Sequence, residues 1–330
     1  MPRRITRALF TAAAAGATIT SLGFAAASPA SAAGHGGKVF APSGGTPIAT
    51  NANCPLAPPV GGPHGAPPAT IPTPEPSVNC ARAGYQASGR NFRFAQALIT
   101  VPNHSGSEDA DPALYVALDN TSTSTYQYTR VGIAPCVAGD TDVFIVPGGS
   151  VDCPSLGDGN TSNWVVFSAT ADAGAPPTVD VEGLPSAFMG DGILVNVYLV
   201  PTSNAVHTVV QLPDGTTYNN TYPITGPVYT RAQALADWTT TVENGGDQPL
   251  PPVPASKGRD AQFFQGRFTT VGGKQGTFAG PWTLNPVEVT SNGTLPPVGT
   301  LIEQPSYLWN DKNGVNGLGQ DAFGIWHFPF

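Results

Sequence analysis

The sequence predicts an all-β protein in which two antiparallel sheets pack face to face as a sandwich. Short segments rich in Val, Ile, Thr, Tyr and Phe recur between residues 92 and 328, and Pro, Gly, Asn and Asp separate them. No long apolar repeat with the period of a helix occurs along the chain. Many short strands without alternating helices form either a sandwich or a barrel, and we favour the sandwich.

The expected strands follow one another at short intervals. The most apolar of them is Gly192–Val200, and Pro213-Asp214-Gly215 forms the turn of a later hairpin because its glycine can adopt a positive φ. In chain order the predicted strands are Phe92–Val101, Ala113–Leu118, Tyr126–Ile133, Asp142–Val146, Asn163–Ser168, Gly192–Val200, Val206–Leu212, Thr216–Ile224, Asp237–Val242, Gln262–Val271, Trp282–Thr290 and Ala322–Phe328.

The segment Arg231–Glu243 combines features of a helix and of a strand. Thr230 followed by Gln233 resembles a capping box, and alanines follow it, as in a helical turn. The later run Thr-Thr-Thr-Val has the β-branched composition of a strand. We therefore expect a helical turn that ends near Asp237 and a strand that begins there. A carboxylate beside Trp238 would be partly shielded from water, which suits a general base.

The chain divides into three parts by composition. Residues 1–32 resemble a secretory signal, with three arginines, an Ala-rich apolar core and the small-residue cleavage site Ala30-Ser31-Ala32. Residues 33–83 are rich in Pro and Gly, and we expect them to form a disordered arm. Residues 84–330 are sufficient for one sandwich domain. The sequence thus predicts an exported protein, and no later segment is long and apolar enough to span a bilayer.

The charge balance limits the partners of the exported chain. Without the three arginines of the leader, 11 basic residues stand against 22 acidic ones. Neither nucleic acid nor an anionic membrane is an expected partner, because both would be repelled. We expect a monomer.

An even number of cysteines in an exported chain favours disulfides over a metal site. Three pairings of the four cysteines are possible, and closure between sequence neighbours favours Cys54 with Cys80 and Cys136 with Cys153. No Cys-x-x-Cys spacing indicates zinc.

Other catalytic and metal-binding patterns are absent from the sequence. The chain has neither a Gly-x-Ser-x-Gly turn nor a His-Glu-x-x-His motif, and no predicted strand carries two carboxylates at alternate positions, as sandwich glycosidases require. Glu108, Asp109 and Asp111 are expected in a solvated turn. Asp311–Asp321 offers oxygen ligands for calcium, but a turn rich in Asn and Gly explains it more simply. We expect no cofactor and no metal.

Several short motifs occur in a fixed order over the predicted domain. They are Gly84-Tyr85 before Phe92-Arg93-Phe94 and Thr100-Val101-Pro102, then Tyr115-Val116-Ala117-Leu118-Asp119-Asn120, Met189-Gly190-Asp191, Ala236-Asp237-Trp238, Asp260-Ala261-Gln262-Phe263 with Phe268-Thr269, and Asn285-Pro286-Val287-Glu288-Val289. In this order they resemble the glutamic peptidases (eqolisins, peptidase family G1), which are secreted acid endopeptidases. The resemblance implies a concanavalin-like sandwich and a polypeptide substrate or ligand.

The resemblance also implies a catalytic pair, which is altered in this chain. The family uses a glutamate as general base and a glutamine that stabilises the oxyanion, and the glutamate position holds Asp237. The glutamine position falls on Tyr128 or Arg130, depending on the alignment, and Gln127 is the nearby glutamine. On a regular strand Gln127 points away from the face of Tyr128, so only a bulge would make it available.

Two functions remain open at this point. Asp237 is either the base of an acid endopeptidase, with Gln127, Tyr128 or Arg130 as the oxyanion partner, or it forms a structural ion pair with Arg130 in a non-catalytic relative. A non-catalytic relative would bind peptide or carbohydrate in the same groove or act as a structural protein. Trp238, Tyr115 and Trp164 are expected to line the groove and contact the substrate.

Overall fold

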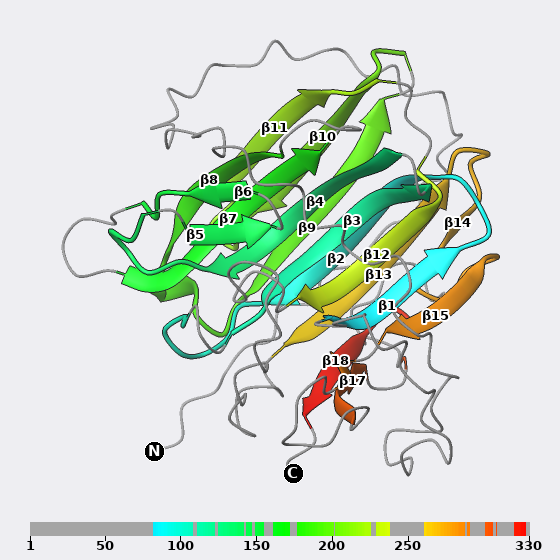
Figure 1. The fold of residues 1–330 in the computed structure, drawn as a ribbon. Coiled ribbons are helices and arrows are strands. Elements are labelled where there is room, and N and C mark those ends of the chain that lie inside the picture. Colours follow the sequence, from blue (N-terminus) through cyan, green and yellow to red (C-terminus); the bar gives the residue numbers. More distant parts are fainter. Residues whose placement is uncertain are drawn as a thin grey trace, which may run out of the picture. The chain divides into compact units, whose positions relative to one another are not determined.

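Two antiparallel sheets lie one behind the other, and their strands run in roughly the same direction (Figure 1). The computed structural model describes residues 82–107, 111–122, 125–141, 143–146, 149–154, 161–171, 177–200, 202–225, 229–237, 261–287, 289–290, 301–305, 308 and 320–327. All of these belong to one unit, Gly36–Phe330. The described ranges contain no α-helix, and the predicted all-β sandwich is confirmed.

The smaller of the two main sheets has seven strands. Their order is β15 (Thr283–Val287), β1 (Arg82–Ser88), β12 (Arg231–Asp237), β3 (Ala113–Ser122), β4 (Thr125–Pro135), β7 (Thr161–Ala171) and β8 (Thr178–Pro185). After β8 a short 3-10 helix, η1 (Ser186–Phe188), leads into the other sheet.

The larger sheet has nine strands. Their order is β11 (Thr217–Pro223), β10 (Ala205–Gln211), β9 (Gly192–Val200), β2 (Phe92–Thr100), β13 (Gln262–Thr270), β18 (Phe323–His327), β17 (Leu301–Pro305) and β16 (Val289–Thr290), with β14 (Gln275–Gly276) paired to β13. The strand predicted over Gly192–Val200 and the hairpin across Pro213-Asp214-Gly215 are confirmed as β9 and β10–β11.

The prediction of a helical turn before Asp237 was wrong, because residues 231–237 form strand β12 in the middle of the seven-stranded sheet. Ala232, Ala234 and Ala236 alternate with larger side chains, and these three alanines belong to the core between the sheets. Alanine has the highest helix propensity of all residues, but helix propensity contributes little free energy per residue, and pairing with β1 and β3 on both sides outweighs it. The predicted strand after Asp237 lies outside the described residues.

Each sheet contributes one face to the main core, and the seven-stranded sheet also buries part of its outer face, the side turned away from the nine-stranded sheet. Two strands, β5 (Val143–Val146) and β6 (Gly149–Val151), form a hairpin there. Ile145, Val146 and Val151 of this hairpin belong to the same buried cluster as Val165 and Phe167 of β7. The outer face near β7 is therefore covered.

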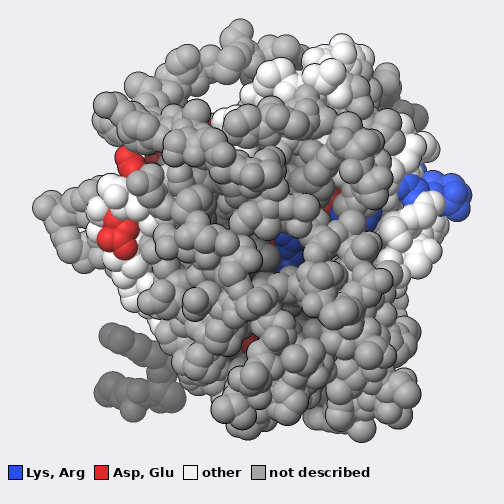
Figure 2. Space-filling view, in the orientation of Figure 1, with Lys and Arg blue, Asp and Glu red and all other residues white. Residues whose placement is uncertain are grey.

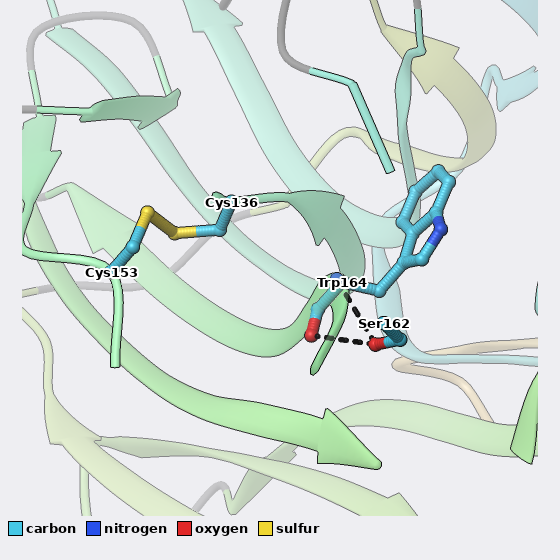
Figure 3. Close-up of a disulfide and its surroundings, with 4 residues drawn as sticks. All are labelled: Cys136, Cys153, Ser162 and Trp164. Carbon is cyan, nitrogen blue, oxygen red and sulfur yellow. Dashed lines mark hydrogen bonds between the residues drawn. A yellow bond between two sulfur atoms is a disulfide. The ribbon is translucent and has the colours of Figure 1, made fainter. Parts of the chain in front are cut away.

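The hairpin β5–β6 is enclosed by a disulfide between Cys136 and Cys153, beside the start of β7 (Figure 3). The Cα atoms of the two cysteines are 5.5 Å apart, within the usual range for a bridge. The predicted pairing of these two cysteines is confirmed. The predicted bridge between Cys54 and Cys80 lies outside the described residues, as do the signal and most of the arm.

Strand β8 was not predicted, and unlike the predicted strands it carries two carboxylates at alternate positions. Its sequence mixes valines with acids, Gly and Pro, which weakens the strand signal. Asp180 and Glu182 occupy alternate positions on it. Asp180 Oδ2 accepts a hydrogen bond of 2.6 Å from Tyr222 Oη of β11, so this carboxylate links the edges of the two sheets. Burial and, to a smaller extent, the negative charge of Asp180 raise the pKa of Tyr222, so the phenol stays protonated.

Glu303 of β17 is 1% exposed, and burial raises its pKa to about 9 from a model-compound value of 4.5. Because the folded-state pKa is the higher one, protonation stabilises the fold fully below about pH 4.5, and this stabilisation is lost as the pH rises toward 9. At pH 7 we expect the free energy of unfolding of Glu303→Gln to exceed that of the wild type by about 3 kcal/mol, so the variant unfolds at a higher temperature. At pH 4 the two proteins should unfold at nearly the same temperature.

Thermal unfolding across this pH range, followed by circular dichroism, measures the difference between wild type and Glu303→Gln. The exposed turn residue Asp214 provides the control, because Asp214→Asn makes the same change from acid to amide outside the core. A difference between Glu303→Gln and wild type that is constant with pH would contradict the prediction.

No helix in the described part of the chain has the length and apolar character needed to cross a membrane.

Candidate functional site

Asp237 is the last residue of β12 and lies on the outer face of the seven-stranded sheet. Its side chain is fully buried, with 0% of the residue exposed. Three donors converge on the same oxygen, Oδ2. Tyr115 Oη and Arg82 Nε each donate at 2.8 Å, and Arg130 Nη1 donates at 3.4 Å. The carboxylate is therefore surrounded by groups that stabilise its ionised form.

The register of the sheet brings these donors together. Arg82 of β1 and Ala113 of β3 are the Cα partners of Asp237 on either side. Tyr115 follows Ala113 by two residues and therefore lies on the same face. Arg130 of β4 is the partner of Ala117. The small side chains of Ala113 and Ala117 leave space on β3 across which the tyrosine and the arginine reach the carboxylate.

A glycine permits the close approach of β1 to β12 that this arrangement requires. Gly84 has a φ of +145°, and a Cβ atom at this position would lie 2.2 Å from the carbonyl oxygen of Ala234. Any larger residue would push β1 away from β12. Arg82 stands two positions before Gly84 on the same strand, so its contact with Asp237 depends on this approach.

Arg130 is buried as deeply as its acidic partner, at 1% exposed. Its guanidinium carbon lies 4.5 Å from the ring centroid of Tyr128 and 4.8 Å from that of Tyr115. Stacking on aromatic rings and pairing with a carboxylate are the two ways in which a buried guanidinium is stabilised. Both operate here, and they fix the orientation of Arg130.

Of the three candidates for the oxyanion partner, Arg130 is the one the structure brings to Asp237. Strand β4 pairs with β3 without any shift in register, so the bulge that Gln127 would need is absent from this pairing. Gln127 alternates with Tyr128 and lies on the face of Thr129, whose hydroxyl contacts Tyr229 Oη at 3.1 Å. Tyr128 lies on the correct face and contacts Arg130.

The predicted aromatic lining of a groove is not formed by Trp164. This ring is 0% exposed and belongs to the core between the sheets, where its indole Nε1 donates to the carbonyl of His104. Ser162 Oγ fixes the backbone beside it by accepting from Trp164 N at 3.1 Å (Figure 3). Tyr115 is buried and donates to Asp237, and Trp238 lies outside the described residues.

Further polar pairs on the same face were not anticipated from the sequence. Arg231 binds Asp119 through two hydrogen bonds, of 2.6 Å from Nε and 3.1 Å from Nη2. Gln233 Nε2 donates to Gln86 Oε1 at 2.8 Å. These pairs join Cα partners on neighbouring strands, so only knowledge of the register reveals them. Acidic and basic atoms also lie beside one another at the centre of the view in Figure 2.

One of the three acids expected in a solvated turn before β3 is instead buried. Asp111 is 2% exposed, and its carboxylate accepts hydrogen bonds from His104 Nε2 at 2.9 Å and from the backbone N–H of Ser107 at 2.8 Å. The hydrogen bond between His104 and Asp111 thus has a structural role. The hydroxyl of Ser105, the residue after His104, donates to the backbone carbonyl of Ser162. Glu108 and Asp109 lie outside the described residues.

The described ranges contain no group of three or more His, Cys, Asp or Glu side chains placed to hold a metal ion. The candidate calcium loop Asp311–Asp321 lies outside these ranges apart from Gln320 and Asp321.

Comparisons with known proteins give matches among solved structures. No protein-family model matches the chain, and a search of curated proteins finds no match. The chain is similar to scytalido-glutamic peptidase with a peptide-based transition state analog, at 14% identity and a TM-score of 0.45, over 76% of this chain and 98% of that chain. It is also similar to SCP-B, a member of the eqolisin family of peptidases in complex with the tripeptide Ala-Ile-His, at 12% identity and a TM-score of 0.43. The match covers 76% of this chain and 98% of SCP-B. Galectin-Ib of Xenopus laevis matches at 15% identity and a TM-score of 0.25, over 47% of this chain and 92% of the galectin chain.

Proposed function

We propose that the chain is a secreted, eqolisin-like β-sandwich protein without peptidase activity, in which Asp237 is a structural ion-pair residue. The observation that carries the proposal is the set of three donors, Arg82, Tyr115 and Arg130, on one oxygen of a fully buried carboxylate. A general base must contact the water that it activates, and a carboxylate enclosed in this way has no water from bulk solvent in reach.

The residue at the oxyanion position is also committed to the fold. An oxyanion donor must point to the place where negative charge develops on the substrate. Arg130 instead points to Asp237 and is held between the rings of Tyr115 and Tyr128. An arginine in that position neutralises the acid, whereas the glutamine that the family resemblance implies would leave the acid free to act.

Secretion is part of the proposal and is supported by two features of the chain. The first 32 residues have the charge, apolar core and cleavage site of an export signal. The bridge between Cys136 and Cys153 requires an oxidising compartment to persist.

A cleavage assay tests the proposal. The mature protein is incubated with an unfolded protein substrate between about pH 2 and pH 6, beside Asp237→Ala and beside an acid peptidase as a positive control for the substrate. We expect no cleavage by either form of the protein. Cleavage by the wild type that is lost in Asp237→Ala would overturn the proposal.

An acid endopeptidase with an altered catalytic pair is the second candidate. One observation favours it, which is that Asp237 and Arg130 face one another at 3.4 Å on one side of one sheet. In that case Asp237 acts as base, and the assay above shows cleavage with an acidic optimum.

A further inference from the structure

The outer face of the nine-stranded sheet is partly exposed to solvent across β2, β9, β10 and β11. Along β9, Ile193, Val195 and Val197 are buried in the core, whereas the alternating residues Leu194, Asn196 and Tyr198 are half-buried. The same alternation continues in β2 and β10, and every second residue of β11 is exposed. This face is on the other sheet from Asp237.

One row of side chains across this face is aromatic. Phe94, Tyr198, His207 and Thr221 are Cα partners on four successive strands. The rings of Tyr198 and His207 stack with centroids 5.0 Å apart and an interplanar angle of 8°. A hydrogen bond of 2.8 Å joins Thr221 Oγ1 and His207 Nδ1. The row is thus an ordered ladder of rings that ends in a hydroxyl.

A second row, two residues further along the strands, carries amides. Gln96 and Asn196 are Cα partners, Val209 follows on β10, and Asn219 follows on β11. Two residues of a strand span about 7 Å, and neighbouring strands lie about 4.8 Å apart. Each amide carries both donors and an acceptor. The two rows together place rings and hydrogen-bonding groups side by side over four strands.

The charges of the face select a neutral ligand. Arg267 of β13, the Cα partner of Gln96, places a positive charge beside the two rows. Its guanidinium carbon lies 6.0 Å from the ring centroid of Phe94, and the guanidinium is hydrogen-bonded to Gln275. Burial lowers the pKa of His207, so its imidazole is neutral at neutral pH. The exposed acids Asp191 and Asp214 flank the sheet in a chain with 22 acidic and 14 basic residues, so an anionic ligand would be repelled.

We propose that this open strip, consisting of Phe94, Gln96, Asn196, Tyr198, His207 and Asn219, binds a neutral polysaccharide that lies across the strands. A neutral sugar chain offers apolar C–H surface to the rings and hydroxyl groups to the amides. Strand spacing is close to the advance of one sugar residue in an extended glycan, so successive sugars meet equivalent positions on successive strands. The inference is independent of whether Asp237 is catalytic.

Retention on insoluble polysaccharides tests the inference with the mature protein. The probes are cellulose, chitin, curdlan and xylan, with heparin as an anionic comparison. We expect retention on at least one of the four neutral polymers and a loss of affinity of about tenfold or more in Tyr198→Ala and in Asn196→Asp. Asn196→Asp preserves the shape of the side chain and keeps the test valid if Tyr198→Ala unfolds. Asn103→Asp, at an exposed position away from the strip, should bind as the wild type does.

Four outcomes would overturn the inference. These are no retention on any neutral polymer, retention on heparin alone, retention that neither strip variant reduces, and self-association in sedimentation velocity that both strip variants abolish. The last outcome would identify the face as a contact between copies of the chain.

Discussion

Asp237→Ala should lower the free energy of unfolding by about 3–5 kcal/mol, the range seen when one partner of a buried ion pair is removed. The variant leaves Arg130, at 1% exposed, without the carboxylate that neutralises it. Arg82 and the hydroxyl of Tyr115 lose the same acceptor. Denaturant unfolding of wild type and variant at neutral pH measures the difference.

Two controls define this effect. Asp214→Asn removes an exposed charge from the turn between β10 and β11 but keeps the side-chain oxygen that accepts from the backbone N–H of Thr216, and it should change the free energy of unfolding by less than about 0.5 kcal/mol. Tyr115→Phe removes one hydrogen bond to the carboxylate and should cost about 1.5–3 kcal/mol. An Asp237→Ala variant as stable as Asp214→Asn would show that the buried pairing does not stabilise the fold.

Removal of the bridge between Cys136 and Cys153 should have the second largest effect. The double variant Cys136→Ala/Cys153→Ala should lose about 3 kcal/mol, because the disulfide closes a short loop and restricts the unfolded chain. Hydrogen exchange should also increase in β5 and β6, since the loop that holds the hairpin against β7 is no longer closed.

The second predicted pair of cysteines offers a matched control. Cys54→Ala/Cys80→Ala alters residues that we expect in the arm, and it should leave exchange in β5 and β6 unchanged. Peptide mapping without reductant tests the expected bridge between Cys54 and Cys80. Unchanged stability and exchange in Cys136→Ala/Cys153→Ala would contradict the structural role of the described bridge.

Strands with a strongly apolar, β-branched composition could be predicted from the sequence, and some others could not. Gly192–Val200 was predicted because it is the most apolar of the expected strands and is rich in Val, Ile and Leu, and its bounds are those of β9. In β12 the buried face is made of alanines, which have no preference for strands, and the pairing with β1 and β3 decides the structure. Strand β8 was missed although Val179 and Val181 alternate with Asp180 and Glu182, because acidic residues, Gly and Pro have a low propensity for strands.

Part of the candidate site could be predicted from the sequence, namely Asp237 and a set of three possible partners. The family resemblance selected Asp237 and left Arg130 as one of three partners, but the choice among them depends on the regular register of β3 and β4. The contact with Arg82 was not foreseen, because this residue was assigned to the arm. Burial of the carboxylate results from contacts between strands that are distant in the sequence, and a local pattern does not report them.

The coupling free energy between Asp237 and Arg130 tests the structural role of this pair most directly. It is obtained from the unfolding free energies of wild type, Asp237→Ala, Arg130→Met and the double variant. We predict a coupling of at least about 1 kcal/mol, with the double variant less destabilised than the sum of the single variants, because the two charges stabilise one another in a buried site. Effects that add within about 0.3 kcal/mol would contradict the account.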